Sequence, residues 1–196
     1  MKALIGIFLL FVLSLSAASQ ADDYDNFLKL TEQVGAVSAA GKFDESSTLA
    51  RSLLRDATAY QTDWNYGNAV HVAHLALGRA ALSNHDLVEA EKQLLLSVDA
   101  KTLCMRSFQK PGATPIDRTK CDASPQMDSF GPDMLLAKEL LAAGRKDAVL
   151  KYLELCAEFW KMDDGHLIEW QAEIKKGSIP DFGANLIYFF PEVKPK

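Results

Sequence analysis

The chain has 196 residues, of which 48% are hydrophobic, and this is enough to build one domain with a sizeable core. Its formal net charge is −5 and its basic residues are scattered. This charge pattern argues against a nucleic-acid-binding protein, which would need a clustered basic face to hold the phosphate backbone.

The first 21 residues have the pattern of a secretory signal peptide. Lys2 supplies a positive start, residues 4–15 are mostly apolar, and small residues lead up to Ala21. We expect cleavage between Ala21 and Asp22, which leaves residues 22–196 as a single domain of net charge −6 (−5 − 1). A retained anchor is the alternative, but the apolar run is short of the ~20 residues that span a bilayer. The sequence therefore predicts a periplasmic or secreted protein with no stable membrane insertion after cleavage.

Three cysteines in an exported chain favour a disulfide. Cys104 and Cys121 flank a segment rich in turn formers, 110–115, whereas Cys156 lies in an apolar helical run. We predict a Cys104–Cys121 disulfide within an irregular insertion, 101–131, and a buried, unreactive Cys156. The bond should contribute on the order of 3 kcal/mol by restricting the unfolded chain. A metal site is the alternative, but no further cysteine or histidine lies close in sequence to complete four ligands.

Apolar residues recur at three- and four-residue steps along most of the chain, which predicts an all-α fold of about seven helices. The first four helices are expected to end at Gly41, to run from about Asp44 through Tyr60, to run from Ala69 to Ser83, and to run from after Asp86 through Val98. The last three are expected to run from Pro132 to Gly144, to include 149–160 and stop at 163–165, and to run from His166 to Lys176.

Local signals place several boundaries. Asp86, with Glu89 three residues later, outlines a capping box. Pro132 is expected in the first turn of its helix, where a missing N–H is tolerated. Residues 63–68 break the periodicity and are predicted to connect two helices. The apolar residues 186–190 are predicted to pack on the last hairpin.

Three predicted turns look alike: residues 40–43, 84–87 and 143–146 each join two helices with an apolar stripe. The middle hairpin, with Leu77-Gly78 in its first helix and Ala90 in its second, resembles the tetratricopeptide repeat family. It also carries size-related substitutes for the family's Tyr, Phe and Ala, namely Ala81, Leu94 and Ser97. The resemblance implies an α-α superhelix of three degenerate hairpins with the terminal helix and tail as a cap. The turns are 44 (85 − 41) and 59 (144 − 85) residues apart, whereas the family period is about 34.

Residues 128–188 are also similar to exported bacterial proteins of uncharacterised function. The shared features are a Phe-Gly-Pro helix start, here 130–132, and a Pro-Asp-Phe-Gly-Ala-Asn segment, here 180–185. This second resemblance implies kinship and no activity.

In tetratricopeptide proteins the first helix of each hairpin lines the concave, peptide-binding side. The resemblance therefore implies a groove that carries Arg79, Ser83, Lys138 and Thr31. Arg79 and Lys138 would hold a carboxylate of a partner peptide through charge-assisted hydrogen bonds. The alternative is that both are solvated or pair with Glu139 and similar neighbours.

The connection before the third helix offers further candidates. Asn65, Tyr66 and Asn68 are predicted as polar loop contributors to any site. His71 and His74 are three residues apart on one helix and are weak metal-ligand candidates with Asp63 or His85. A packed or hydrogen-bonded pair of histidines is favoured, because no third ligand is identifiable.

The sequence contains no phosphate-binding glycine loop, Gly-x-Ser-x-Gly elbow or His-Glu-x-x-His motif. We therefore predict a monomeric, exported scaffold that binds a protein or peptide partner, with no catalytic residues and no cofactor. The alternative is a small-molecule or metal-binding protein, or an enzyme, that uses the Trp64–His74 region. A third possibility is a helical component of a larger envelope assembly.

Overall fold

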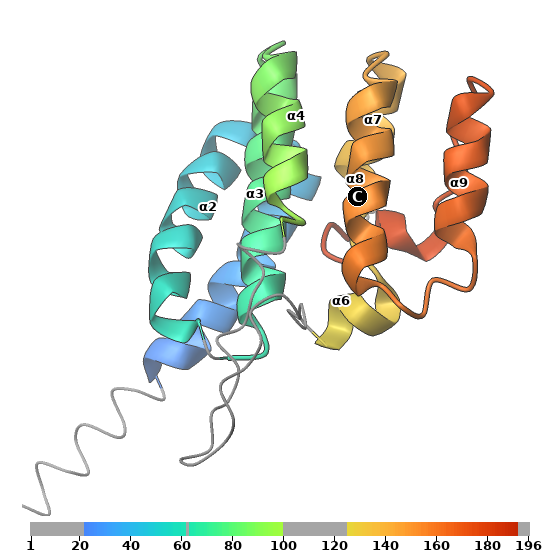
Figure 1. Ribbon diagram of the computed structural model, residues 1–196. Coiled ribbons are helices and arrows are strands. Elements are labelled where there is room, and N and C mark those ends of the chain that lie inside the picture. Colours follow the sequence, from blue (N-terminus) through green and yellow to red (C-terminus); the bar gives the residue numbers. More distant parts are fainter. Residues whose placement is uncertain (1–21, 62, 100–124, 192–196) are drawn as a thin grey trace, which may run out of the picture.

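The computed structural model describes residues 22–61, 63–99 and 125–191, and every regular element within these ranges is a helix (Figure 1). Residues 22–39 form the first helix. It is followed by α2 (Phe43–Ala57), η1 (Thr58–Tyr60), α3 (Tyr66–Ser83), α4 (Leu87–Leu96), α6 (Pro125–Phe130), α7 (Leu135–Ala142), α8 (Lys146–Phe159), α9 (His166–Lys175) and η2 (Gly183–Leu186). The predicted all-α class is confirmed.

Some predictions fall outside the described residues. These are the signal peptide, 1–21, and the Cys104–Cys121 disulfide. In the part of the chain that is described, no helix is long and apolar enough to cross a membrane. Cys156 is buried on α8 as predicted, and burial raises the pKa of its thiol well above the ordinary value, which keeps it protonated.

Three helix-to-helix turns share one backbone geometry. Gly41, His85 and Gly144 have φ values of 72°, 60° and 78°. In each turn the next residue donates its N–H to a carbonyl five residues back, and the left-handed residue donates to a carbonyl three back. This is the hydrogen-bond pattern with which a left-handed residue ends a helix. The prediction that the three turns are alike is confirmed at the level of the backbone.

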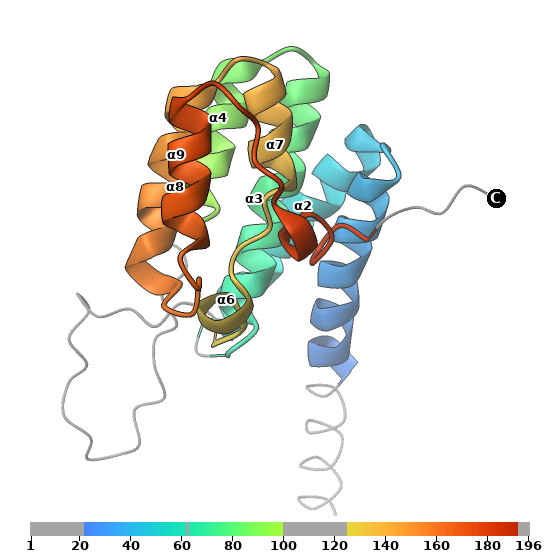
Figure 2. The same cartoon turned by 90° about the vertical axis from the view of Figure 1, so that its right-hand side faces the viewer.

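The helices stand side by side, with axes close to parallel, in a row that runs from α2 to α9 (Figure 1). Consecutive partners in the row are α2 and α3, α3 and α4, α4 and α8, and α8 and α9, while α7 packs on α3, α4 and α8. Figure 2 shows α4 and α8 towards one side of the molecule, α3 and α7 in the middle, and helix 22–39 on the other side.

Close packing around α3 explains the Leu77-Gly78 pair. A side chain at Gly78 would place its Cβ 2.3 Å from Cδ2 of Leu136 and 3.3 Å from the carbonyl oxygen of Ala90. Only glycine lets α3 approach both α4 and α7 at this point. Most of α3 is buried, as predicted for a helix that is apolar nearly all round.

Two predicted helix starts were wrong. The third helix begins at Tyr66 instead of Ala69, because Asp63 accepts the N–H of Asn65 on its side chain and that of Tyr66 on its carbonyl. Pro132 does not open a helix: α7 begins at Leu135, whose N–H is accepted by the Asp133 carboxylate. In both cases an aspartate side chain, and not the apolar pattern, sets the first turn.

Two further predictions about regular structure were wrong. The short helix α6 lies inside the stretch 101–131, which was predicted to be irregular. The sixth helix ends at Phe159, earlier than its predicted stop at 163–165, and Trp160 is extended. Trp160 is buried against Gly131, where a Cβ would lie 2.5 Å from two ring atoms, so the chain leaves the helix to place the indole.

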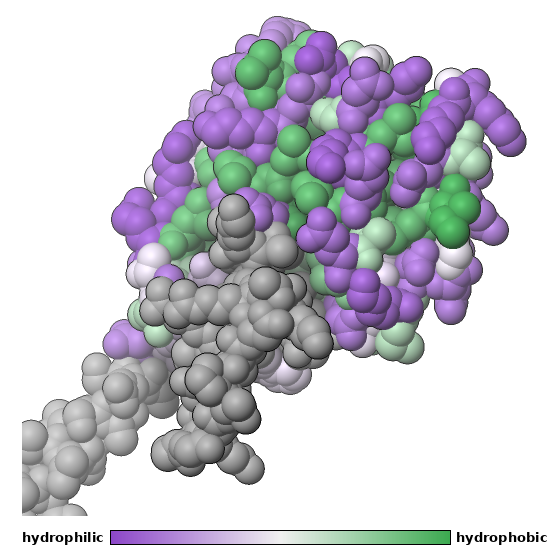
Figure 3. All heavy atoms as spheres, in the orientation of Figure 1, coloured by the Kyte–Doolittle hydropathy of each residue, from purple (hydrophilic) through white to green (hydrophobic). Residues whose placement is uncertain are grey.

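The face formed by α4, α8 and α9 is mixed in polarity. Figure 3 shows patches of apolar atoms on this face, separated by polar side chains. The two most exposed large apolar residues, Val88 on α4 and Ile168 on α9, are 73% and 75% exposed. Single exposed apolar residues of this kind are ordinary on a protein surface.

Candidate functional site

The candidate site is built around the C-terminal tail, which we define as residues 178–191. After α9 the tail runs past α7 and reaches the side where helix 22–39 lies, opposite α4 and α8 (Figure 2). Phe182 begins this path by packing edge-on against Trp170 of α9, with ring centroids 5.0 Å apart. The prediction that residues 186–190 pack on the last hairpin was wrong, because Phe189 and Phe190 contact His71 and Arg79 of α3.

Asn185 fastens the tail to the segment before α7. Its carbonyl oxygen accepts the N–H of Met134 at 2.6 Å. Its side-chain amide donates to the carbonyl oxygens of Phe130 and Pro132 at 3.0 and 2.9 Å. These three bonds satisfy backbone groups that no helix pairs, so the tail and the link between α6 and α7 hold each other in place.

Phe189 joins three separate elements. Its N–H donates to Oδ2 of Asp133 at 3.2 Å, and its ring meets that of His71 edge-on at 5.6 Å. Its carbonyl oxygen lies against helix 22–39 so closely that a Cβ on Gly35 would be 2.0 Å away. The absence of a side chain at Gly35 is therefore a condition for the tail to lie where it does.

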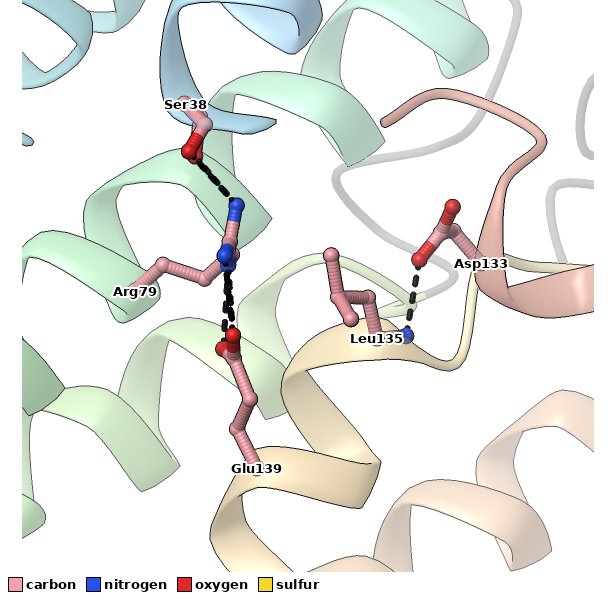
Figure 4. A network of polar contacts seen from close by, with 5 residues as sticks. All are labelled: Ser38, Arg79, Asp133, Leu135 and Glu139. Atoms are coloured by element: carbon pink, nitrogen blue, oxygen red, sulfur yellow. Dashed lines mark hydrogen bonds and ion pairs between the residues drawn. The ribbon is translucent and has the colours of Figure 1, made fainter. Parts of the chain in front are cut away.

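Arg79 of α3 lies beneath the end of the tail. Its guanidinium donates to the carbonyl and hydroxyl oxygens of Ser38 at 2.8 and 3.1 Å, and to both oxygens of Glu139 at 2.8–3.0 Å (Figure 4). The rings of Phe43 and Phe190 each lie 5.5 Å from its central carbon. This residue therefore connects helix 22–39, α2, α3, α7 and the tail through one charged group.

Asp133 is a buried acid without a salt-bridge partner among the described residues. Its Oδ1 accepts from Leu135 at 2.8 Å, its Oδ2 accepts from Phe189, and its carbonyl oxygen accepts from the hydroxyl of Tyr152 at 2.8 Å. Burial raises the pKa of its carboxyl to about 7, against the opposing effect of the two N–H donors and of Arg79. Figure 4 shows its carboxylate directed at the first turn of α7 beside the tail.

The bonds of His71 determine its tautomer. The carbonyl of Ser97, at 3.0 Å from Nδ1, can only accept, and the N–H of Asp133, at 3.0 Å from Nε2, can only donate. The ring is therefore neutral with its proton on Nδ1. Burial lowers the pKa of His71 to about 4, in agreement with this geometry.

The histidine pair is thus hydrogen-bonded, which was the favoured interpretation. His74 donates from Nδ1 to Gln93 at 2.7 Å, and Gln93 donates in turn to Glu89 at 2.6 Å. Burial lowers the pKa of His74 as well. Among the residues that the structure describes, no group of three His, Cys, Asp or Glu side chains is arranged to hold a metal ion.

The predicted groove residues differ in burial and partners. Arg79 is buried and paired with Glu139, which was the alternative, so it is not an open cation beside Lys138. Lys138 is exposed on α7, and Ser83 is exposed with its hydroxyl donating to the carbonyl of Ala80. Thr31 donates to the carbonyl of Phe27 within its own helix.

The predicted loop residues also have structural contacts. The side chain of Asn65 donates to the hydroxyl of Tyr24, which donates to Asp63, so the start of α3 is tied to helix 22–39. Asn68 is buried, and Tyr66 is half-buried in the first turn of α3. Both are helical residues, not members of a loop.

Sequence reasoning missed Asp133 and the two tail phenylalanines as site residues. A signal for Asp133 was present, because an aspartate between a proline and an apolar run is a common helix-capping position. No comparable signal identifies Phe190, since an aromatic residue in an apolar tail has many places to pack.

No known protein family, curated protein or solved structure matches this chain.

Proposed function

We propose that the protein is an exported scaffold that binds a peptide segment of a partner, with residues 1–21 as its signal peptide. The scaffold would be a tetratricopeptide-like superhelix in which helix 22–39, α3 and α7 are the first helices of three hairpins. The three turns with one shared geometry and the row of side-by-side helices support this arrangement.

One observation carries the proposal: an irregular peptide segment already lies across the first helices. Phe189 and Phe190 of the tail reach Gly35 on helix 22–39, His71 and Arg79 on α3. A surface that holds one irregular segment by backbone hydrogen bonds and aromatic side chains has the chemistry needed to bind such segments in general.

No specific observation favours the alternative of a metal or small-molecule site in the Trp64–His74 region. Both ring nitrogens of His71 are already engaged, by Ser97 and by the N–H of Asp133.

Site-specific photo-crosslinking in the expressing cell tests the proposal. A photoreactive side chain at Lys138, exposed on α7, should form adducts with a partner. The same group at Lys151, whose side chain is 57% exposed on α8, is the matched control and should form few. Equal adducts from both positions, or none from Lys138, would contradict a binding side lined by the first helices.

Intact-mass analysis of the same purified protein tests the export and disulfide predictions. Loss of residues 1–21 indicates processing, and alkylation at Cys104 and Cys121 only after reduction indicates the bond. Free alkylation of both cysteines without reductant would contradict the pairing.

A further inference from the structure

The protein's own C-terminal tail lies on the proposed binding side. We define the tail-binding face as the surface formed by Gly35, Phe43, His71, Arg79 and Asp133. We propose that residues 185–190 are a replaceable internal ligand of this face, and that the partner binds by displacing them with a segment carrying two adjacent aromatic residues. The inference rests on the proposed function and specifies its ligand.

The Arg79 part of the face is held in place without the tail. Arg79 is held by Ser38 and by both oxygens of Glu139, and none of these bonds involves the tail. Phe43 supplies one aromatic ring at 5.5 Å from the guanidinium, independently of Phe190. If the tail leaves, the Arg79 guanidinium stays in place and the position of the Phe190 ring beside it becomes vacant. A preorganised site of this kind loses little conformational entropy when it binds an aromatic side chain.

After η2 ends at Leu186, residues 187–190 of the tail belong to no helix or sheet. Beyond Asn185, its contacts with the face are the Phe189 N–H on Asp133, the Phe189 carbonyl against Gly35, the Phe189 ring on His71 and the Phe190 ring on Arg79. The middle of the segment is open to solvent, because Ile187 and Tyr188 are 47% and 38% exposed, whereas Phe190 is buried, at 2% exposed. Because residues 187–190 belong to no helix, they can leave the face without unfolding one.

The contacts define the chemistry of the replacing segment. A backbone N–H is needed for Oδ2 of Asp133, and one aromatic ring is needed at His71 and a second at Arg79. The main chain of the segment must also approach Gly35 without a side chain between them. A peptide with two consecutive aromatic residues meets these conditions, as Phe189-Phe190 does here.

Because it is tethered to the face, the tail would compete well with a partner segment. A segment on the same chain acts at an effective concentration of roughly millimolar. A free peptide of the same sequence must therefore reach that range before it displaces the tail of the native protein. A partner would overcome this through additional contacts or a better-fitting segment.

The experiment uses a fluorescently labelled peptide of residues 184–191 and full-length protein variants, with anisotropy as the readout. Phe190→Ala weakens the tail and leaves the face intact, so the peptide should bind this variant at least tenfold more tightly than the native chain. A peptide with alanine at the second phenylalanine should bind it at least tenfold more weakly. Ile187→Ala, which shortens a side chain that is 47% exposed, is the matched control and should behave like the native chain.

A second variant blocks the face itself. Gly35→Ala puts a methyl group where the Phe189 carbonyl lies, while alanine suits the middle of a helix better than glycine, so the helix should still form. Adding it to Phe190→Ala should abolish the gain in binding, with the helical circular dichroism unchanged. Unchanged affinity of Phe190→Ala relative to the native chain, or strong binding to the double variant, would overturn the inference.

Three other results separate the hypotheses. If the native chain forms concentration-dependent dimers that Phe190→Ala lacks, the tail binds a second copy, and the inference of a foreign partner is overturned. If the tail peptide does not bind the Phe190→Ala variant while crosslinked adducts still form from Lys138, the inference about the tail fails and the proposed scaffold function stands. If the peptide binds as expected but no partner is crosslinked, the tail-binding face is supported and the proposed cellular function is not.

Discussion

Two buried polar clusters that include residues of α3 accommodate ionisable groups in different ways. At Arg79 the buried charge is matched by Glu139, which accepts from two guanidinium nitrogens. At His71 and Asp133 the groups receive only neutral hydrogen-bonding partners, and both are held away from their ordinary pKa, His71 at about 4 and Asp133 at about 7.

The difference shows that pairing and neutralisation are alternative ways to bury an ionisable group. A matched ion pair keeps both charges and depends on both partners being present. A group without a counter-charge changes its protonation instead, so its cost depends on pH. The tail contacts both clusters, since Phe190 packs on Arg79 and Phe189 bonds to Asp133.

The largest expected effect comes from breaking the ion pair. Glu139→Ala leaves the Arg79 guanidinium, only 9% exposed, without its carboxylate, and should lower the free energy of unfolding by about 3 kcal/mol, as for other buried pairs that lose one partner. Urea unfolding measures this change. A loss below about 1 kcal/mol would mean that Ser38 and solvent hold the charge adequately.

The next effect is a pH dependence with two opposite signs. The folded pKa of His71 is below the ordinary 6.5, so its contribution to stability is complete above pH 6.5 and is lost as the pH falls towards 4. The folded pKa of Asp133 is above the ordinary 3.8, so its contribution is complete below that pH and is lost as the pH rises towards 7. Between about pH 4 and 6.5 the two slopes oppose each other and largely cancel in the native chain.

Single variants should separate the two slopes. With Asp133→Asn, stability should rise with pH across this window by about 3 kcal/mol relative to the native chain, since only His71 still titrates there. With His71→Gln, it should fall with pH by a similar amount. Denaturant midpoints at pH 4.5, 5.5 and 6.5 measure the difference in stability between each variant and the native chain. The titration of all other groups is common to the three proteins and cancels in this difference. Parallel curves for all three proteins would rule out a neutralised pair.

A smaller effect is expected at Tyr152. Tyr152→Phe removes the hydroxyl that donates to the carbonyl of Asp133 at 2.8 Å in a buried position, and should cost about 1 kcal/mol. Tyr188→Phe is the control: Tyr188 is 38% exposed, and removal of its hydroxyl should change stability by less than about 0.5 kcal/mol. Equal losses from both substitutions would show that the Asp133 contact has no special value. Thermal unfolding is sufficient to compare them.

The smallest effect is expected at an exposed ion pair of α8. Lys151 and Glu154 are each 57% exposed, and Lys151→Ala should change the unfolding free energy by less than about 0.5 kcal/mol. The contrast with Glu139→Ala, measured in the same urea series, tests whether burial is what makes the Arg79 pair important. A loss at Lys151 as large as that at Glu139 would refute that explanation.

Much of the local structure was predictable because its causes lie within one helical turn. Asp86 caps α4 by accepting the N–H of Glu89 at 3.0 Å, as its spacing indicated. Gly41 and Gly144 end their helices in the left-handed conformation that glycine adopts without strain. Where local reasoning failed, as at Pro132, the side chain of the neighbouring Asp133 sets the helix start at Leu135, three residues further along.

The candidate site was not predictable in the same way, because its partners are far apart in the sequence. Arg79 and Glu139 are 60 residues apart, His71 and the Asp133 N–H are 62, and Asp133 and the Phe189 N–H are 56. The sequence alone determined the helices, their turns and the apolar stripes, since these follow from spacing and backbone preference. The tertiary structure decided which charges are buried and where the tail lies, because burial and pairing depend on which helices pack together.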